Sequence, residues 1–509
     1  MYFNNKIVIG KKGEEELFIL PKMANRHGVI TGASGSGKTT TVKVMAEGFS
    51  AAGIPVFYVD VKGDLASICK KGEASEKIEE RLNTMGVEGF EYQSFPTVFF
   101  DVYQKLGHPI RTTISNISPR LLSRMLGLSD AQEGILAIVF QIAQDEDMKL
   151  NDLGDLKSLL QHVGDNKEEY IPKYGNITTQ SIGAIQRNVL MLQQEGGDYF
   201  FGKPELQLFD LLQYDMNGHG FVNVLDAQEL FKKPTLYAVF LVWILNYLYD
   251  SLPEVGDLER PKLILFLDEA HLIFSEMSSI LIKQIIQVVK LIRSKGVGVY
   301  FISQSPSDIP DEILAQLGNK VQHVLRSYTP SDEKAIKAAA NSFRTNPEFK
   351  TEDAIKVLAT GEALVSFLNE KGEPNIVERA MILPPQSFMG TISDSERDQI
   401  IKSSRIYSKY ETVMDEVSAT EKVDEAKKAK EEAIEAEKRA KEEAIEAEKK
   451  AKEEAKAKEK AEKEKKKEEE KKQKEKERMV KKVTNSVTNK VIGKATTKVV
   501  NSVWKSIFK

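Results

Sequence analysis

Short, uninterrupted apolar runs alternate with longer segments of helical periodicity over most of the chain. Five of these runs, at 27–31 (HGVIT), 54–60 (IPVFYVD), 221–226 (FVNVLD), 262–269 (KLILFLDE) and 297–303 (VGVYFIS), have the length and β-branched content of buried strands. Amphipathic or apolar helical segments separate them. Strands that alternate with helices in this way predict an α/β fold with a doubly wound, mainly parallel sheet.

Two regions of residues 1–410 depart from this alternation. Residues 1–20 have two apolar runs around GKKGEEE, which predicts a short hairpin. Residues from about 112 to 216 show helical periodicity without β-branched runs, which predicts an all-helical insertion. After it, further strands are expected at VQHVLRS, EALVSFL and VERAMIL. Residues 1–410 are therefore predicted to be one α/β unit interrupted by helices.

The pattern changes abruptly after about residue 410. KEEAIEAEKRA at 430–440 is followed directly by KEEAIEAEKKA at 441–451. A repeat of 11 residues corresponds to about 3.67 residues per helical turn, which gives a nearly straight helix rather than a heptad seam. Glu and Lys four residues apart support such a helix. Residues 411–479 are predicted to form a charged helix or linker, and both an isolated helix and a coiled coil remain open.

Residues 480–509 form a third segment, a basic amphipathic tail. Apolar residues, mostly valines, recur every three or four positions from Val480 to Ile507, with Lys, Asn, Thr and Ser between them. Three interpretations compete: a helix that docks on a protein partner, a helix on a membrane surface, or a tail that contacts DNA.

Charge is distributed unevenly over these segments. Residues 421–479 hold 22 Lys/Arg and 21 Asp/Glu, and residues 480–509 hold seven Lys and no acid. The formal net charge of −4 for the whole chain therefore leaves about −12 on residues 1–420. An acidic core argues against broad coating of nucleic acid, but it leaves room for a narrow basic pore.

Cysteine content and hydropathy indicate the compartment. Cys69 is the single cysteine, so no disulfide framework forms within the chain, and this suits a reducing environment. The N-terminus lacks the organisation of a signal peptide. The most apolar run, residues 236–249, is short for a membrane span and is predicted to be a buried helix. A cytoplasmic location is expected.

The segment GASGSGKTT fits the phosphate-binding pattern G-x-x-x-x-G-K-[ST] and lies between a predicted strand and a predicted helix. Glycines let successive amide groups curl around a phosphate, and the helix N-terminus favours the anion. Lys38 is expected to reach the β- and γ-phosphates of ATP, and Thr39 to ligate Mg²⁺. The predicted nucleotide-binding residues are Gly32, Ala33, Ser34, Gly35, Ser36, Gly37, Lys38, Thr39 and Thr40.

An acidic pair closes the strand KLILFLDE. Asp268 is predicted to hold Mg²⁺ through water, and Glu269 to polarise the attacking water. An acid pair after a strand can also cap a helix, but the phosphate-binding segment upstream favours the catalytic interpretation.

Gln304 ends the strand VGVYFIS, which follows the Asp-Glu strand through one helix. The two strands are therefore expected to lie close together. An amide at such a position can donate to phosphate or water and accept in return, so Gln304 is predicted to sense the γ-phosphate. The alternative is a glutamine that bonds a loop.

These motifs together resemble the HerA-like branch of the HerA–FtsK ATPases. The resemblance rests on GASGSGKT, DEAH and SQSP, and it extends to NRHGVITGASGSGKTTT, YVDVKGDL and GNKVQHVLRSYTPSDEKAIKAAA. It covers roughly residues 1–400 and is strongest for a bacterial HerA-like subfamily once described only as a domain of unknown function. The DEAH letters do not indicate a DEAH-box RNA helicase, because that class brings tandem RecA-like domains.

The resemblance implies a RecA-like fold and a homo-hexameric ring ATPase that uses ATP and Mg²⁺ to pump double-stranded DNA, often with a nuclease partner. It implies that Arg26 lies at the nucleotide and that Arg293 is the arginine finger acting on the neighbouring subunit. Arg326 is a second candidate for that finger. Asp60–Asp64 (DVKGD) matches the family's acidic turn, with an open role.

The sequence departs from the archaeal members of the family in one respect. They carry an N-terminal β-barrel that docks the nuclease, and the about 25 residues before the phosphate-binding strand are too few for one. Two functions are therefore carried forward. One is a DNA-translocating motor, and the other is a nucleotide-switched scaffold or assembly ATPase that works through residues 411–509.

Overall fold

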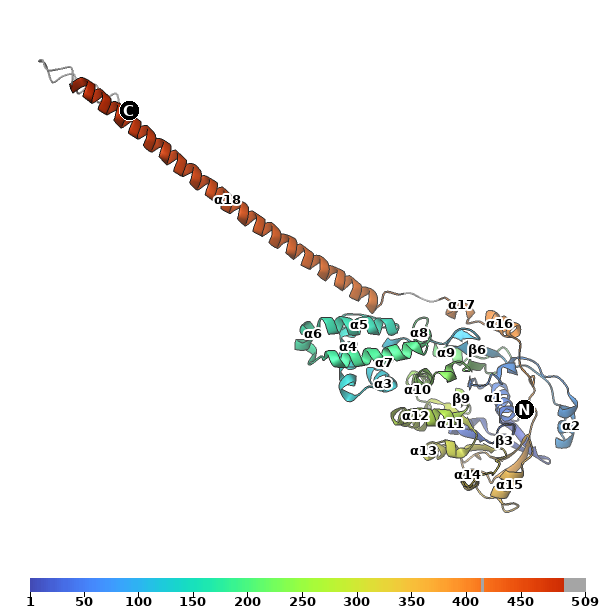
Figure 1. Cartoon of the computed structure of the whole chain (residues 1–509). Helices are drawn as coiled ribbons and strands as arrows, with labels where there is room; N and C mark the ends of the chain where they lie inside the picture. The colour runs from blue at the N-terminus through green and yellow to red at the C-terminus, as the bar shows by residue number, and fades with distance from the viewer. Residues whose placement is uncertain (413–415, 489–509) are drawn as a thin grey trace. The chain divides into compact units, whose positions relative to one another are not determined.

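The computed structural model describes residues 1–412 and 416–488. It divides the chain into two compact units, Met1–Val423 and Asp424–Lys509. Within the described residues, one 13-stranded sheet lies in the first unit, in the order β1-β2-β13-β12-β11-β4-β10-β9-β5-β8-β6-β7, with β3 paired to β2. Figure 1 shows the elements of this unit.

The strands fall into a parallel and an antiparallel part. The parallel part consists of β11 (Asn319–Gln322), β4 (Gly28–Thr31), β10 (Val297–Ser303), β9 (Leu263–Leu267), β5 (Val56–Asp60), β8 (Val222–Asp226), β6 (Thr97–Asp101) and β7 (His108–Pro109). The antiparallel part consists of β1 (Tyr2–Phe3), β2 (Lys6–Lys12), β3 (Glu15–Ile19), β12 (Glu362–Ser366) and β13 (Glu378–Ile382). The predicted mainly parallel α/β sheet is confirmed.

Helices cover both faces of this sheet. Side chains alternate between the faces along each strand: Val56 and Tyr58 of β5 pack with α1 (Lys38–Ala51), whereas Phe57 and Val59 belong to the core on the other face. That second core contains the helices α10 (Pro234–Ser251) and α12 (Ser279–Ile292). Residues 236–249 thus lie within a buried helix, as predicted. No helix in the described part of the chain is both long and apolar enough to span a bilayer.

A group of helices connects β7 to β8 in the sequence. In space it lies beside α10 and α12 (Figure 1). It consists of α3 (Pro119–Met125), α4 (Asp130–Asp145), α5 (Leu153–Asp165), α6 (Lys167–Tyr174), α7 (Thr179–Gln194), α8 (Gly197–Phe200) and α9 (Leu208–Leu211). Side-chain caps start several of these helices. For example, Asp152 accepts from the amide of Asp155 at 2.9 Å. These helices occupy the region where the insertion was expected.

The remaining helices connect or flank the strands. They are α2 (Glu76–Met85), α11 (Ala270–Glu276), α13 (Asp311–Leu314), α14 (Pro330–Asn341), α15 (Thr351–Val357), α16 (Asp394–Ser403) and α17 (Tyr407–Tyr410), with 3-10 turns at Pro21–Arg26, Ala66–Cys69, Ile114–Asn116, Leu230–Lys232, Arg293–Lys295 and Pro306–Asp308. The predicted hairpin is present as β2–β3. Strands β6 and β7 were not predicted, and β11 begins two residues earlier than the predicted strand at 321–327.

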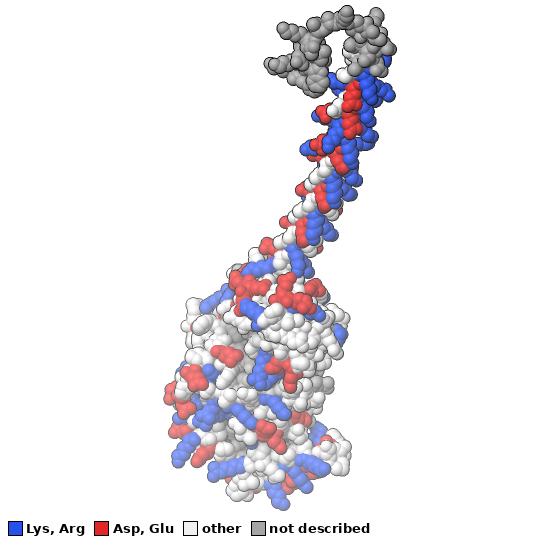
Figure 2. Space-filling model, turned by 90° about the vertical axis from the view of Figure 1, so that its left-hand side faces the viewer, with Lys and Arg blue, Asp and Glu red and all other residues white. Residues whose placement is uncertain are grey.

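Helix α18 (Ala419–Thr488) contains the charged repeats. Its first residues belong to the first unit, because Ala419 and Val423 are fully buried there and Thr420 donates to Asp155 at 2.7 Å. Beyond them, pairs such as Glu435–Arg439 join residues four apart, and Figure 2 shows both charge signs interleaved along the helix. The predicted amphipathic tail beyond residue 488 lies outside the described residues.

Candidate nucleotide site

The phosphate-binding loop connects β4 to α1, as the sequence predicted. Gly35 and Gly37 have backbone φ values of 72° and 106°, which residues with a Cβ atom rarely adopt. A Cβ on Gly32 would lie 2.5 Å from Cβ of His323. Glycine at these positions therefore allows the loop to close tightly in front of the N-terminus of α1, where an anion is favoured.

Lys38 lies in the mouth of this loop. Its Nζ donates to the carbonyl oxygens of Gly32 at 2.5 Å and Ala33 at 3.1 Å. Burial lowers the pKa of Lys38, and the charge of Lys62 adds to this, while Glu269 and Asp268 act in the opposite direction. The ammonium group is thus held among the backbone groups that would surround a phosphate.

His323 packs against the phosphate loop and α1, a contact that the sequence did not predict. It follows β11 and is fully buried, and its Nε2 lies 2.8 Å from the hydroxyl of Thr41 on α1. Burial lowers its pKa to about 4, so the imidazole is neutral at pH 7. A neutral ring at this place adds no charge beside the phosphate site.

The acidic pair lies at the carboxyl end of β9. Asp268 is only 5% exposed, and burial, followed by the charge of Glu269, raises its pKa to about 6. Glu269 has left-handed backbone angles, φ 49° and ψ 47°, which are uncommon for a residue other than glycine. Strained residues of this kind cluster at functional sites.

Glu269 has two polar neighbours that the sequence did not predict. Its Oε1 forms an ion pair with Lys62, and its Oε2 lies 3.1 Å from Nδ1 of His271. Although burial acts to lower it, the hydrogen bond and charge of Glu269 raise the pKa of Lys62. The predicted base is therefore engaged by a cation from the end of another strand.

Gln304 lies where the sequence predicted, at the end of β10. This strand pairs with both β4 and β9, so it separates the phosphate-loop strand from the Asp-Glu strand. Gln304 and Glu269 line one cavity of about 390 Å³, together with Lys62, Gln228, His271, Val61, Phe231, Lys232 and Leu272. The structure thus brings Gln304 and Glu269 to one site and adds Gln228, which the sequence did not single out.

The turn DVKGD shapes one side of this site. The buried carboxylate of Asp60 accepts hydrogen bonds from the amides of Lys62, Gly63 and Leu65 at 3.2, 2.7 and 3.0 Å. Burial raises the pKa of Asp60 to about 7. The turn presents Lys62 to Glu269, and it places Asp64 3.4 Å from the hydroxyl of Thr39. Asp60 is thus a structural residue of the turn.

The donor set fits Mg²⁺ shared with a nucleotide. Among the described side chains, no group of three or more His, Cys, Asp or Glu is placed to hold a metal ion. Mg²⁺ commonly takes one or two protein oxygens and completes its shell with water and phosphate. The Thr39 hydroxyl and the Asp268 carboxylate are ligands of that kind.

The two predicted arginines lie at the amino ends of the parallel strands, opposite the carboxyl ends that carry the nucleotide site. Arg26 precedes β4, and Arg293 follows α12 and precedes β10, so both are at the amino ends of parallel strands. Burial lowers the pKa of Arg26, and the positive charge of Arg293 contributes next. Arg293 also pairs with Asp257 at 3.5 Å.

Arg26 is also separated from the phosphate loop of its own subunit. The four residues of β4, about 13 Å of strand, separate Arg26 from the phosphate loop of its own chain. The sequence neighbourhood of Arg26 and the loop therefore does not bring them together within one subunit. Arg326, by contrast, follows the carboxyl end of β11 and is exposed.

A phosphate loop, an acidic strand end and a polar residue on the strand between them define a P-loop ATPase. The family model "Helicase HerA-like C-terminal" matches residues 5–508, so the chain belongs to the HerA-like helicase family. The resemblance predicted from the motifs is thereby confirmed.

Individual relatives agree with this assignment. The DNA double-strand break repair helicase HerA of Saccharolobus solfataricus is 23% identical over 405 residues, covering 77% of this chain and 70% of the relative. The protein of the same name from Sulfurisphaera tokodaii is 22% identical over 414 residues, covering 79% and 73%.

Two solved structures are similar at lower identity. The bacterial conjugative coupling protein TrwBdeltaN70 has a TM-score of 0.49 at 15% identity, covering 74% of this chain and 89% of that chain. VirB4 of Thermoanaerobacter pseudethanolicus has a TM-score of 0.45 at 16% identity, covering 75% and 97%.

Proposed function

We propose that this ATPase is a ring motor that hydrolyses ATP with Mg²⁺ and moves double-stranded DNA. The observation that carries the proposal is the cavity shared by Glu269 and Gln304, which follow the adjacent strands β9 and β10, and β10 also pairs with the phosphate-loop strand β4. A base and a neutral amide facing one space can position a water molecule against a γ-phosphate.

The residues would divide the work as follows. Lys38 and the loop amides bind the β- and γ-phosphates, and Gln304 donates to the γ-phosphate or orients the water. Glu269 accepts the proton of the attacking water. Mg²⁺, held by Thr39 and Asp268, would neutralise charge between the β- and γ-phosphates. Lys62 must leave Oε1 of Glu269 for the carboxylate to act as a base.

The arginine pair supports an oligomer. Transferring a phosphoryl group calls for a cation near the γ-phosphate. Arg26 and Arg293 precede β4 and β10, so they lie at the amino ends of these strands, whereas the phosphate loop lies at the carboxyl end of β4. In a ring, the surface formed by the amino ends of these strands in one subunit can face the nucleotide of the next subunit. We therefore assign Arg293 as the finger acting in trans, with Arg26 beside it, in a homo-hexamer.

The polymer is inferred from the relatives. Both curated relatives above are named as DNA double-strand break repair helicases. Duplex DNA is accordingly the proposed track, and the cytoplasm is the proposed location. The core residues 1–420 carry about −12, so contact with DNA must come from a local basic surface of the ring rather than from net charge.

The test is ATP hydrolysis by the full chain with and without linear duplex DNA. The expected result is stimulation by DNA, with hydrolysis abolished in Lys38→Ala. Arg293→Ala mixed with Lys38→Ala should recover partial activity, because the former supplies an intact phosphate loop and the latter an intact finger. Robust hydrolysis that ignores duplex DNA would reject the motor and leave the ATPase.

A second function is favoured by one observation. Helix α18 continues from a docked first turn into an exposed stretch with many pairs of opposite charge. Such a helix suits a nucleotide-switched scaffold that binds a protein partner through residues 411–509. If ATP hydrolysis, ring formation and DNA stimulation all survive removal of residues 424–509, this segment serves interaction and not movement.

A further inference from the structure

Arg26 ends the 3-10 turn Pro21–Arg26, and a buried tyrosine holds this turn from β10. The hydroxyl of Tyr300 donates to the carbonyl oxygen of Ala24 at 3.0 Å, and the side chain of Tyr300 is fully buried. A Cβ atom on Gly28 would lie 2.4 Å from the ring of Tyr300. The glycine at the start of β4 therefore leaves the space through which the ring reaches the turn.

An asparagine holds the same turn from β11, the strand on the other side of β4. The Nδ2 atom of Asn319 donates to the carbonyl oxygens of Met23 at 3.0 Å and His27 at 3.1 Å, and Asn319 is only 1% exposed. The amide of Gly318 donates to the carbonyl oxygen of Arg26 itself at 3.0 Å. Hydrogen bonds from β11 thus fix the backbone on both sides of the Arg26 side chain.

The backbone directly after Arg26 is strained. His27 has a φ of 57° and a ψ of 172°, close to a region that glycine alone commonly adopts. In the described part of the chain, the buried residues other than glycine with a positive φ are His27 and Glu269. Strain of this kind persists where the surrounding structure enforces it, most often at functional sites. The Arg26 turn therefore shares a property with the position of the proposed base.

The guanidinium group of Arg26 lies beside the turn that connects β12 to β13. A Cβ atom on Gly372 in this turn would lie 3.5 Å from Nη1 of Arg26. Asn319 also reaches the strand that leads into it, because its Oδ1 accepts from the amide of Leu368 at 3.4 Å. One buried side chain thus joins the backbone that carries Arg26 to the segment against which its guanidinium group lies.

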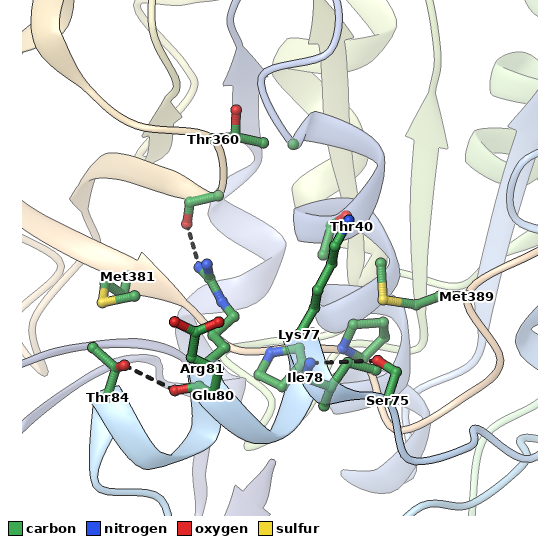
Figure 3. A pocket seen from close by; sticks show the side chains of 14 residues that line it. Thr40, Ser75, Lys77, Ile78, Glu80, Arg81, Thr84, Thr360, Met381 and Met389 are labelled. Carbon is green, nitrogen blue, oxygen red and sulfur yellow. Dashed lines mark hydrogen bonds between the residues drawn. The ribbon is translucent and has the colours of Figure 1, made fainter.

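This support does not serve the nucleotide site of the same subunit. One cavity there is shared by Glu269 and Gln304, and a larger one, of about 590 Å³, is lined by Thr40 of the phosphate-loop helix and by side chains of α2 (Figure 3). The Arg26 turn and the side chains that hold it line neither cavity. A fixed position for Arg26 therefore has its use outside its own subunit.

We propose that Tyr300 and Asn319 are positioning residues, which set Arg26 in the place from which it reaches the nucleotide of the neighbouring subunit. The proposal rests on the proposed ring, in which Arg26 acts in trans beside Arg293. A displacement of about 1 Å in a group that acts on the reaction can cost roughly 100-fold in rate. Buried hydrogen bonds to the backbone of the turn prevent such a displacement.

The first variant is Tyr300→Phe, which keeps the buried ring and removes only the hydroxyl that bonds Ala24. We expect ATP turnover about tenfold below wild type, with unchanged affinity for a non-hydrolysable ATP analogue. Asn319→Ala should lower turnover further, and Tyr300→Phe decides if that variant does not fold. Tyr103→Phe is the matched control, because Tyr103 is 7% exposed and its hydroxyl donates to the carbonyl oxygen of Glu195 at 2.9 Å. It should turn over ATP as wild type does.

Mixed rings provide the readout that separates positioning from a general structural role. Lys38→Ala subunits supply Arg26, and Arg26→Ala subunits supply an intact phosphate loop, so their mixture should recover part of the activity. Adding Tyr300→Phe to the Lys38→Ala chain should lower the recovered activity about tenfold. Adding it to the Arg26→Ala chain should leave the recovered activity unchanged, because that subunit no longer provides the arginine.

Equal lowering in both mixtures would show that Tyr300 only stabilises the sheet, and it would overturn the proposal. Wild-type turnover of Tyr300→Phe alone would do the same. A parent mixture of Lys38→Ala and Arg26→Ala without recovered activity would reject the action of Arg26 in trans, and the positioning role with it. Hydrolysis that is indifferent to duplex DNA would reject only the motor.

Discussion

Two features fix the position of Glu269. Its backbone has left-handed angles, and its carboxylate forms an ion pair with Lys62 from the turn after β5. Both features keep the carboxylate in the cavity that Gln304 also lines. The ion pair with Lys62 occupies Oε1 of that carboxylate. For Glu269 to accept the proton of the attacking water, as proposed, Lys62 must first move away.

Gln304→Ala should lower ATP turnover at least tenfold while the affinity for ATP changes little. The amide lines the cavity of the base but not the phosphate loop, so its loss affects the orientation of water more than binding. Turnover and equilibrium binding of a non-hydrolysable analogue provide the measurement.

Gln316→Ala is the control for this change, because Gln316 is also exposed and lies outside that cavity. Turnover equal to wild type in Gln304→Ala would mean that the glutamine only ends the strand. A loss of folded protein would point to a structural role.

Local motifs predicted the central residues of the site, but not their neighbours. Lys38, Asp268 and Glu269 lie in runs whose spacing carries the chemistry. His323, Gln228 and Lys62 are single polar residues after buried strands, and only the pairing of those strands brings them to the site. Arg26 shows the reverse case, since closeness in sequence conceals the strand that separates it from the loop.

At the scale of elements, β10 was predicted best and β6 was missed. The helix between KLILFLDE and VGVYFIS implied neighbouring parallel strands, and β9 pairs with β10. Strand β6 is five residues long and follows a segment rich in turn residues, so its pattern was not distinctive. The antiparallel pairing of β12 with β13 follows from their short connection.

The first turn of α18 is an element of the core rather than of the tail. A chain ending at Val423 should keep the stability of the full chain, whereas a chain ending at Tyr410 should lose on the order of 3 kcal/mol. The shorter chain lacks the buried Val423 and the hydrogen bond from Thr420 to the carboxylate of Asp155. Urea unfolding of both chains measures the difference.

A pair of valines provides the point-mutation control for this prediction. Val423 is 0% exposed and Val417 is 65% exposed. Val423→Ala should be destabilising and Val417→Ala neutral. Equal stability of the two variants would show that the docked turn contributes nothing to the core.

At the scale of the whole molecule, three buried histidines make folding sensitive to acid. Burial lowers the pKa values of His27, His108 and His323 to about 4, from an ordinary value of 6.5. As the pH falls below 6.5, the unfolded chain takes up protons that the folded chain does not. Stability is therefore lost between pH 6.5 and 4.

The expected loss between pH 7 and 5 is about 2 kcal/mol for each of these histidines, at 1.36 kcal/mol per pKa unit. His27→Asn should reduce the total loss by that amount. The side-chain oxygen of asparagine can accept from the amide of Val299, as Nδ1 of His27 does at 3.0 Å. Unfolding by urea at both pH values is the measurement, and an unchanged loss in His27→Asn would contradict the prediction.

The sequence predicted a boundary near residue 410, where the composition changes abruptly. The structure carries the first unit on to Val423. No pattern within residues 416–423 predicts that they dock on the first unit. Their burial depends on Lys149 and Asp155, which are far away in the sequence.

The repeat of 11 residues in α18 has a consequence for how this protein can vary. Eleven residues at about 100° each complete three turns with about 20° to spare, and they lengthen the helix by about 16.5 Å. Gain or loss of one repeat by unequal recombination would therefore change the reach of the helix while hardly rotating what lies at its end. The length of α18 can therefore change by whole repeats while the orientation of its end stays nearly the same.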